Sequence, residues 1–258
     1  MRTALLLLSM TALTAMTWQE KEEFLKTAKI VKTYGVSKGI TGTERVTLSD
    51  GKFSHDASVQ RIDESKAKFE GGMGGSEINF RDSYKYNVAA WKLALMLGID
   101  DMIPPSVERP YKGSSAAYTW WVDDVLMDEG DRKKKKEEAP DKTSWNQELF
   151  VMHVFDQLIH NMDRNLGNML IDKKWHLWMI DHTRAFRLFR QVKEPKMLQK
   201  CDRALLAKMK SLTEANMREA IGPYLTREEV RGVIGRRDAI VKAFTARGEA
   251  VMFDRPTR

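Results

Sequence analysis

Residues 160–186, HNMDRNLGNMLIDKKWHLWMIDHTRAF, decide the fold because they place three carboxylates among apolar residues. Asp163, Asp172 and Asp181 flank two short apolar runs that look like strands, with a two-lysine turn between them. Ionised carboxylates do not enter a protein core without a partner. We therefore expect a salt bridge, a metal ion or a reaction to account for Asp163 and Asp181.

The spacing of the polar residues points to one of these three. Asn168 follows Asp163 by five residues, and Asp181 follows Asn168 by 13. If residues 167–172 and 175–181 pair as a hairpin, Asp181 returns to the side of Asn168. Magnesium prefers oxygen ligands and is usually held by one or two carboxylates together with substrate phosphates, so Asn168 and Asp181 are candidate ligands for Mg²⁺ or Mn²⁺. Asp163 can then accept a hydrogen bond from an attacking hydroxyl, as in phosphoryl transfer.

Each carboxylate also has a purely structural interpretation. Asp163 follows a predicted helix and can cap its end, and Asp181 can form an ion pair with Arg164 or Arg184. Either interpretation would be preferred for one residue alone. The combination with Asn168 at this spacing favours the catalytic interpretation.

The same stretch carries a resemblance to known kinases. VFDQLIHNMDRNLGN at 154–168, followed by LWMIDHTRAF at 177–186, resembles the Golgi casein kinase family of secretory-pathway kinases. It is also similar to the phosphatidylinositol 3-/4-kinases and the HipA-type kinases, which share an atypical kinase architecture. A weaker similarity over 87–108 covers the helix C region of these families. The resemblance implies a kinase fold, ATP as the phosphate donor and a divalent metal.

The resemblance also implies roles for individual residues. Asp163 matches the catalytic Asp, Asp181 matches the metal-binding Asp of the D-F-G triplet, and Asn168 matches the second metal ligand of the lipid kinases and ordinary protein kinases. The Golgi group carries Glu at this last position. His182 replaces the usual Phe or Asn, and the Arg after the catalytic Asp, here Arg164, is expected to have a structural or phosphate-facing role.

The first lobe departs from the kinase pattern at its lysine. A kinase holds the α- and β-phosphates with a Lys that pairs with a Glu on helix C. Here Gln60 and Arg61 stand where a lysine is expected, and Asn87 stands where the Glu is expected. Lys66, Lys68 and Lys85 are the candidates for the missing cation, and we favour Lys66. The missing pair also leaves open a nucleotide-binding pseudokinase that acts as a scaffold or activator.

The order of the expected elements predicts an α+β protein of two lobes. We expect a strand-rich kinase N-lobe over 18–122, a helical kinase C-lobe over 123–258 and the ligand site in the cleft between them. The elements expected from periodicity and turn residues are a helix at 20–32, strands at 45–48, 57–62 and 115–127, a glycine-rich loop at 69–80, a helix at 83–98 capped by Asp82 and stopped by Gly98, a polar loop at 128–142, and a helix at 144–161.

The segment TWWVDDV at 119–125 is the expected hinge, where the adenine of ATP would meet backbone groups. We expect Trp120 or Trp121 to pack in the core and the other to line the adenine slot together with Val122, although core packing suits both. The glycine-rich segment 35–42 is a candidate for the loop that covers the phosphates.

Composition limits the function classes and the compartment. The 258 residues carry a net charge of +7, and the lysine run 133–136 is followed at once by two glutamates, so we expect a solvated surface and no nucleic-acid partner. Residues 4–16 form an apolar segment of 13 residues, too short to span a bilayer but suited to a signal peptide over 1–17. We expect export on this basis, and a helix packed on the domain is the alternative. The acceptor hydroxyl could belong to a protein, a glycan or a lipid.

Overall fold

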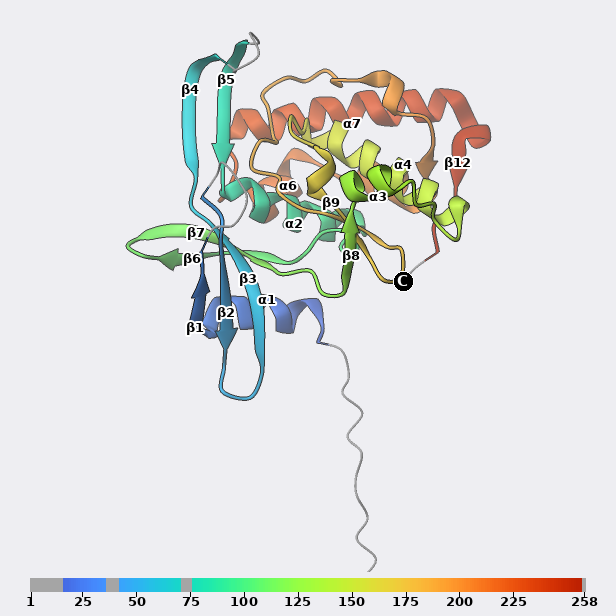
Figure 1. The fold of residues 1–258 in the computed structure, drawn as a ribbon. Coiled ribbons are helices and arrows are strands. Elements are labelled where there is room, and N and C mark those ends of the chain that lie inside the picture. Colours follow the sequence, from blue (N-terminus) through green and yellow to red (C-terminus); the bar gives the residue numbers. More distant parts are fainter. Residues whose placement is uncertain (1–15, 36–41, 71–75, 257–258) are drawn as a thin grey trace, which may run out of the picture.

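The computed structural model describes residues 16–35, 42–70 and 76–256, and in them a sheet-based N-lobe is followed by a helical C-lobe (Figure 1). The expected α+β class is therefore confirmed. Among the described residues, no helix has both the length and the apolar character needed to cross a membrane. The N-lobe sheet is antiparallel, in the order β1 (Lys29–Tyr34), β2 (Glu44–Ser49), β3 (Ser54–Gln60), β7 (Ser114–Trp120) and β6 (Ser106–Tyr111).

The first helix is shorter than predicted. Helix α1 (Trp18–Thr27) begins with a capping box between Thr17 and Glu20 and buries Phe24 against the sheet. The expected helix at 20–32 is wrong beyond Thr27, because Ala28 is extended and β1 pairs with β2. The β-branched residues of β1 fit a strand better than a helix, and the cross-strand partners that reveal this lie more than ten residues away.

The expected glycine-rich loop is a hairpin. Strand β4 (Asp63–Glu70) pairs with β5 (Ser76–Ser83), and only residues 71–75 at its tip lie outside the described residues. Asp82 therefore lies within a strand, and the prediction that it caps the next helix is wrong. The N-cap residue of helix α2 (Lys85–Leu97) is instead Tyr84, which makes no side-chain capping hydrogen bond. The C-cap residue is Gly98, as predicted, with a φ of 68°. The hairpin extends beyond the five-stranded sheet, beside the C-lobe (Figure 1).

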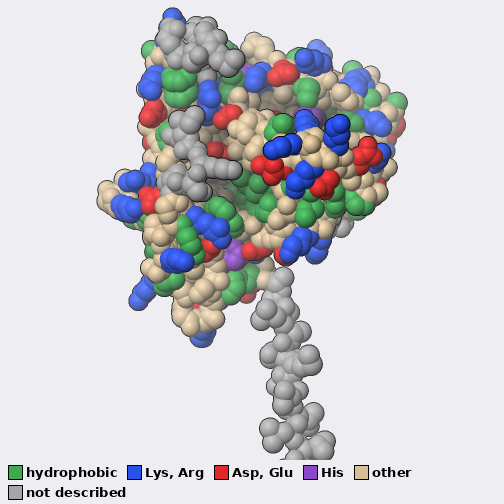
Figure 2. All heavy atoms as spheres, in the orientation of Figure 1, with side chains coloured by type: hydrophobic (Ala, Val, Ile, Leu, Met, Phe, Trp, Pro, Cys, Tyr) green, Lys and Arg blue, Asp and Glu red, His purple; other side chains and the backbone are tan. Residues whose placement is uncertain are grey.

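The connection between the lobes is interrupted. Strand β7 ends at Trp120, and β8 (Val125–Asp128) begins a second sheet, so the single strand expected at 115–127 is wrong. The expected polar loop at 128–142 contains a helix, α3 (Glu129–Lys135), capped by Asp128. Its lysines lie among acidic residues, and Figure 2 shows basic and acidic side chains interspersed on this face.

The C-lobe is built on helices that share one large core with α2. Cys201 is buried in the short strand β11. The remaining elements are α4 (Lys142–Ile159), a 3-10 turn (Leu166–Asn168), β9 (Met169–Asp172), β10 (Leu177–Met179), a 3-10 turn (Pro195–Met197), β11 (Cys201–Asp202), α5 (Arg203–Ser211), α6 (Glu214–Ile221), α7 (Arg227–Arg247), a 3-10 turn (Gly248–Val251) and β12 (Met252–Phe253).

Candidate active site

The loop after α4 presents Asp163. The helix ends at His160, which takes a left-handed conformation with φ of 51° and so turns the chain out of the helix. The Asn161 side chain then accepts the backbone N–H of Asp163 at 3.0 Å. The Asp163 carboxylate is half-buried and accepts a bond of 3.2 Å from Asn165, while the Asn168 amide donates to the Asp163 carbonyl at 3.1 Å. The loop is thus held by its own asparagines.

The hairpin predicted between 167 and 181 is present and brings Asn168 and Asp181 together. Met169 of β9 pairs with Met179 of β10, and the Ile180 N–H donates to the Asn168 carbonyl at 3.1 Å. Asp181 has a φ of 53°, a left-handed conformation that is uncommon for a residue other than glycine and is frequent at functional sites. Its carboxylate accepts a bond of 3.0 Å from the Thr183 hydroxyl.

Arg164 braces the two halves of this hairpin from inside. Its guanidinium donates to both oxygens of Asp156 at 3.0 Å, to the carbonyls of Asn168 and Ile180 at 2.8 Å, and lies 2.9 Å from the His182 ring. Arg164 is therefore the partner of Asp156 and not of Asp181. Burial, helped by the charge of Arg164, holds the pKa of His182 well below 6.5, so its neutral ring accepts this bond.

The positions of the missing Lys–Glu pair are joined by amides. Asn87 of α2 donates to the Gln60 side chain of β3 at 2.5 Å, and its oxygen accepts the backbone N–H of His182 at 2.7 Å. Both amide side chains are buried. The pair thus occupies the expected location, links the N-lobe sheet to the residue after Asp181, and carries no charge.

The three candidate lysines lie on or next to the β4–β5 hairpin of the N-lobe. Lys66 forms an exposed ion pair with Glu64 at 2.9 Å, Lys68 lies further along β4 opposite Ile78, and Lys85 pairs with Asp63 at 2.9 Å. Lys66 shares a neighbour, the Phe80 ring, with Arg184, which follows Asp181 by three residues. Its ammonium lies 5.7 Å from the centre of the Phe80 ring, and the guanidinium of Arg184 lies 5.2 Å from the same point.

A further carboxylate, Asp82, lies beside Asp181. Asp82 is 5% exposed and its Oδ1 has no hydrogen-bond partner among the described residues. The next residue, Ser83, donates its N–H to the Thr183 carbonyl at 2.9 Å, and Thr183 also hydrogen-bonds the Asp82 side chain. Burial and then the charge of Asp181 raise the pKa of Asp82, against the effect of Thr183. Sequence reasoning gave Asp82 a capping role, because only the tertiary fold brings it to Asp181.

The hinge residues divide between core and surface. Trp120 is 6% exposed and stacks on His55 with ring centres 3.7 Å apart. Trp121 is 37% exposed, lies over Arg45, and donates its backbone N–H to the Asp56 carbonyl at 3.1 Å. Val122 is buried. The glycine-rich segment expected to cover the phosphates lies mostly at 36–41, outside the described residues.

The chain is similar in fold to solved structures. Fam20 from Hydra, solved with a sugar, aligns with a TM-score of 0.66 at 17% identity over 92% of each chain. The chain has the fold of an atypical kinase. The Helicobacter pylori proinflammatory kinase CtkA aligns over 84% of this chain and 92% of its own, with a TM-score of 0.49 and 12% identity. No protein-family model and no curated protein sequence matches the chain.

Proposed function

We propose that the protein is an ATP-dependent phosphotransferase that uses Mg²⁺ or Mn²⁺ and transfers the γ-phosphoryl group to a hydroxyl of a protein, glycan or lipid. The observation that carries the proposal is local: Ile180, next to Asp181, bonds the Asn168 backbone across the β9–β10 hairpin, and the Asn168 amide bonds the Asp163 carbonyl. The atypical kinase fold supports it. The sugar in the Hydra structure puts glycans among the first acceptors to test. The apolar N-terminal segment adds export to the proposal.

The residues at this site fit a divalent metal. Asp181 and Asn168 offer oxygen atoms, and the partnerless buried oxygen of Asp82 is the kind of group that a cation satisfies. A bound metal would neutralise phosphate charge. Asp163 would orient the acceptor hydroxyl and accept its proton, while Lys66 with Arg184, or else Lys68 or Lys85, would hold phosphate oxygens.

The test is phosphate transfer from labelled ATP to mixed protein, glycan and lipid acceptors with Mn²⁺ or Mg²⁺. Asp163→Ala should lower the rate by about 10²–10⁴, the usual contribution of a positioned acid or base. Asp181→Ala should remove the metal-dependent rate. Asp238→Ala is the matched control, since this aspartate adjoins an arginine in the sequence, as Asp163 does, but lies exposed on α7.

The neutral Gln60–Asn87 pair favours a second candidate, a nucleotide-binding pseudokinase that acts as a scaffold. The two candidates are separated by measuring two properties together. Binding of Mn²⁺ and ATP is measured by electron paramagnetic resonance and calorimetry, and phosphate transfer is measured by the assay above. Nucleotide binding without transfer to any acceptor supports the scaffold, and absence of nucleotide binding removes both candidates.

A further inference from the structure

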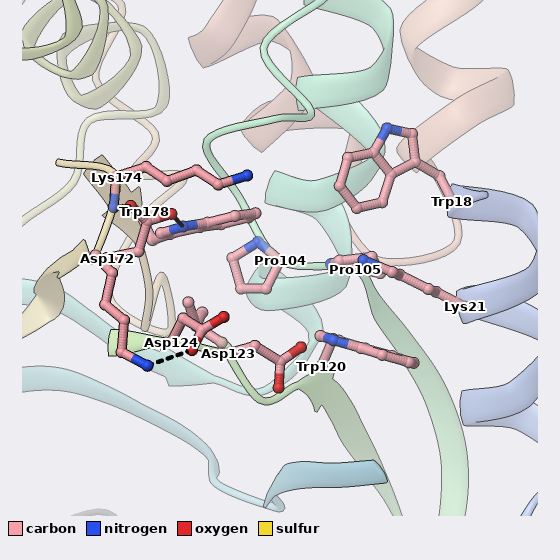
Figure 3. Close-up of a pocket in the computed structure, with 12 residues that line it drawn as sticks. Trp18, Lys21, Pro104, Pro105, Trp120, Asp123, Asp124, Asp172, Lys174 and Trp178 are labelled. Carbon is pink, nitrogen blue, oxygen red and sulfur yellow. Dashed lines mark hydrogen bonds and ion pairs between the residues drawn. The ribbon is translucent and has the colours of Figure 1, made fainter. Parts of the chain in front are cut away.

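A cavity lies between the lobes, next to the expected hinge segment 119–125. Its volume is about 380 Å³, and none of Asp163, Asn168 and Asp181 is among the described residues that line it. The walls come from the start of α1, the segment after α2, the hinge, and the turn between β9 and β10, as Figure 3 shows. A molecule bound here would therefore contact both lobes outside the phosphoryl-transfer site.

Three hydrogen-bond donors face this cavity without an acceptor. The Trp120 side chain is 6% exposed, yet its Nε1–H has no partner among the described residues. The Lys21 ammonium lies 4.5 Å and 5.0 Å from the ring centres of Trp18 and Trp120, and burial lowers its pKa. Lys174 extends into the cavity from the opposite side (Figure 3) and makes no side-chain hydrogen bond or ion pair with a described residue. Only Trp120 is buried, while Lys21 is half-buried and Lys174 is exposed. The indole N–H is therefore the donor whose lack of an acceptor is costly unless a ligand or water satisfies it.

The carboxylates that line the cavity already have partners. Asp123 accepts from His55 at 2.9 Å, and Asp124 pairs with Lys173 at 2.7 Å. Asp172 accepts from the Trp178 indole at 3.2 Å and from two backbone N–H groups of its own turn. The side chain of Asp123 is 66% exposed, so water screens its attraction for Lys21. The groups of the cavity that lack a partner are therefore donors, and a ligand would have to supply the hydrogen-bond acceptor.

The rest of the wall is apolar. Trp18, Trp178, Pro104, Pro105 and Val122 offer flat or aliphatic surface to the cavity. We infer that this cavity binds an organic anion, a carboxylate or phosphate attached to an apolar or aromatic body, held by Lys21, Lys174 and the Trp120 N–H. The volume is at the lower end of the roughly 300–1,000 Å³ of small-molecule sites.

The test uses the full chain and calorimetric titration with phenyl phosphate and benzoate. Both should bind saturably, whereas inorganic phosphate and benzyl alcohol, which each lack half of the recognised chemistry, should bind more weakly. Lys21→Met and Lys174→Met should each weaken phenyl phosphate binding by about 10- to 100-fold, the usual value of a charged hydrogen bond. Trp120→Phe, which keeps the stacked ring and removes the donor, should weaken it by about 3- to 10-fold.

Two controls separate this cavity from other anion sites. Lys52→Met, in the exposed turn between β2 and β3, should bind like the wild type. Asp181→Asn should also bind like the wild type, and this result would hold even if the protein proves not to be a kinase. The inference would be overturned if neither probe bound saturably, or if binding were unchanged in both Lys21→Met and Lys174→Met. It would also be overturned if Asp181→Asn lost binding, or if inorganic phosphate bound as tightly as phenyl phosphate.

Discussion

Replacing Arg164 by methionine should destabilise the C-lobe strongly, because the guanidinium is the only charge paired with Asp156 among the described residues. The side chains of Arg164 and Asp156 are 10% and 8% exposed. Removing one partner of a buried ion pair costs about 3–5 kcal/mol. The whole free energy of unfolding of a protein is about 5–15 kcal/mol. At about 2–4 °C per kcal/mol for a chain of this size, the melting temperature should fall by about 6–20 °C.

The assay is urea and thermal unfolding of the wild type, Arg164→Met and two comparison variants. Arg45→Met breaks an ion pair whose arginine is 43% exposed, so this variant should lose less than about 1 kcal/mol of free energy of unfolding. The double variant Arg164→Met/Asp156→Asn removes the uncompensated charge and should recover part of the loss. If Arg164→Met lowers the free energy of unfolding no more than Arg45→Met does, the Arg164–Asp156 contact does not stabilise the protein as a buried ion pair, and the reasoning fails.

Three further predictions concern buried polar groups. Gln60→Lys and Asn87→Glu should each lower the melting temperature, because each buries a lone charge. The double variant pairs the two charges and should melt at a higher temperature than either single variant. A double variant that melts below both would contradict the pairing. Burial holds the pKa of His182 well below 6.5, so the unfolded chain binds its proton first as the pH falls, and stability decreases below pH 6.5. His182→Asn should show a smaller difference in urea unfolding between pH 7.5 and pH 5, and an equal difference would refute this. Burial raises the pKa of the Cys201 thiol to about 12, so a thiol-reactive dye should label it only after unfolding, and labelling of the native protein would exclude this burial.

The parts of the site that could be predicted are local in sequence. The spacing from Asp163 to Asn168, the two-lysine turn and the return to Asp181 lie within 19 residues, and the hairpin forms as predicted. The glycine stop of α2 was predictable for the same reason, since its left-handed conformation depends on Gly98 itself.

The parts that were missed depend on contacts between distant segments. Asp82 acquires its position from the pairing of β4 with β5 and from a backbone bond to Thr183, about 100 residues away. The role of Arg164 was open because nothing in its own segment selects Asp156 over Asp181. The shared contact of Lys66 and Arg184 likewise depends on the pairing of Lys66 with Phe80 across the β4–β5 hairpin and on the distant Arg184 reaching the same ring.

The amide of Asn87 has a consequence for control of the protein. Many kinases are switched by swinging helix C outward, which separates its acid from the lysine of the sheet. Here α2 is fastened at three points, by Asn87 to Gln60, by Asn87 to the backbone of His182, and by Tyr86 to Glu229 of α7. An outward swing of α2 would therefore have to break all three hydrogen bonds, which tie the helix to the N-lobe sheet, to the residue after Asp181 and to α7.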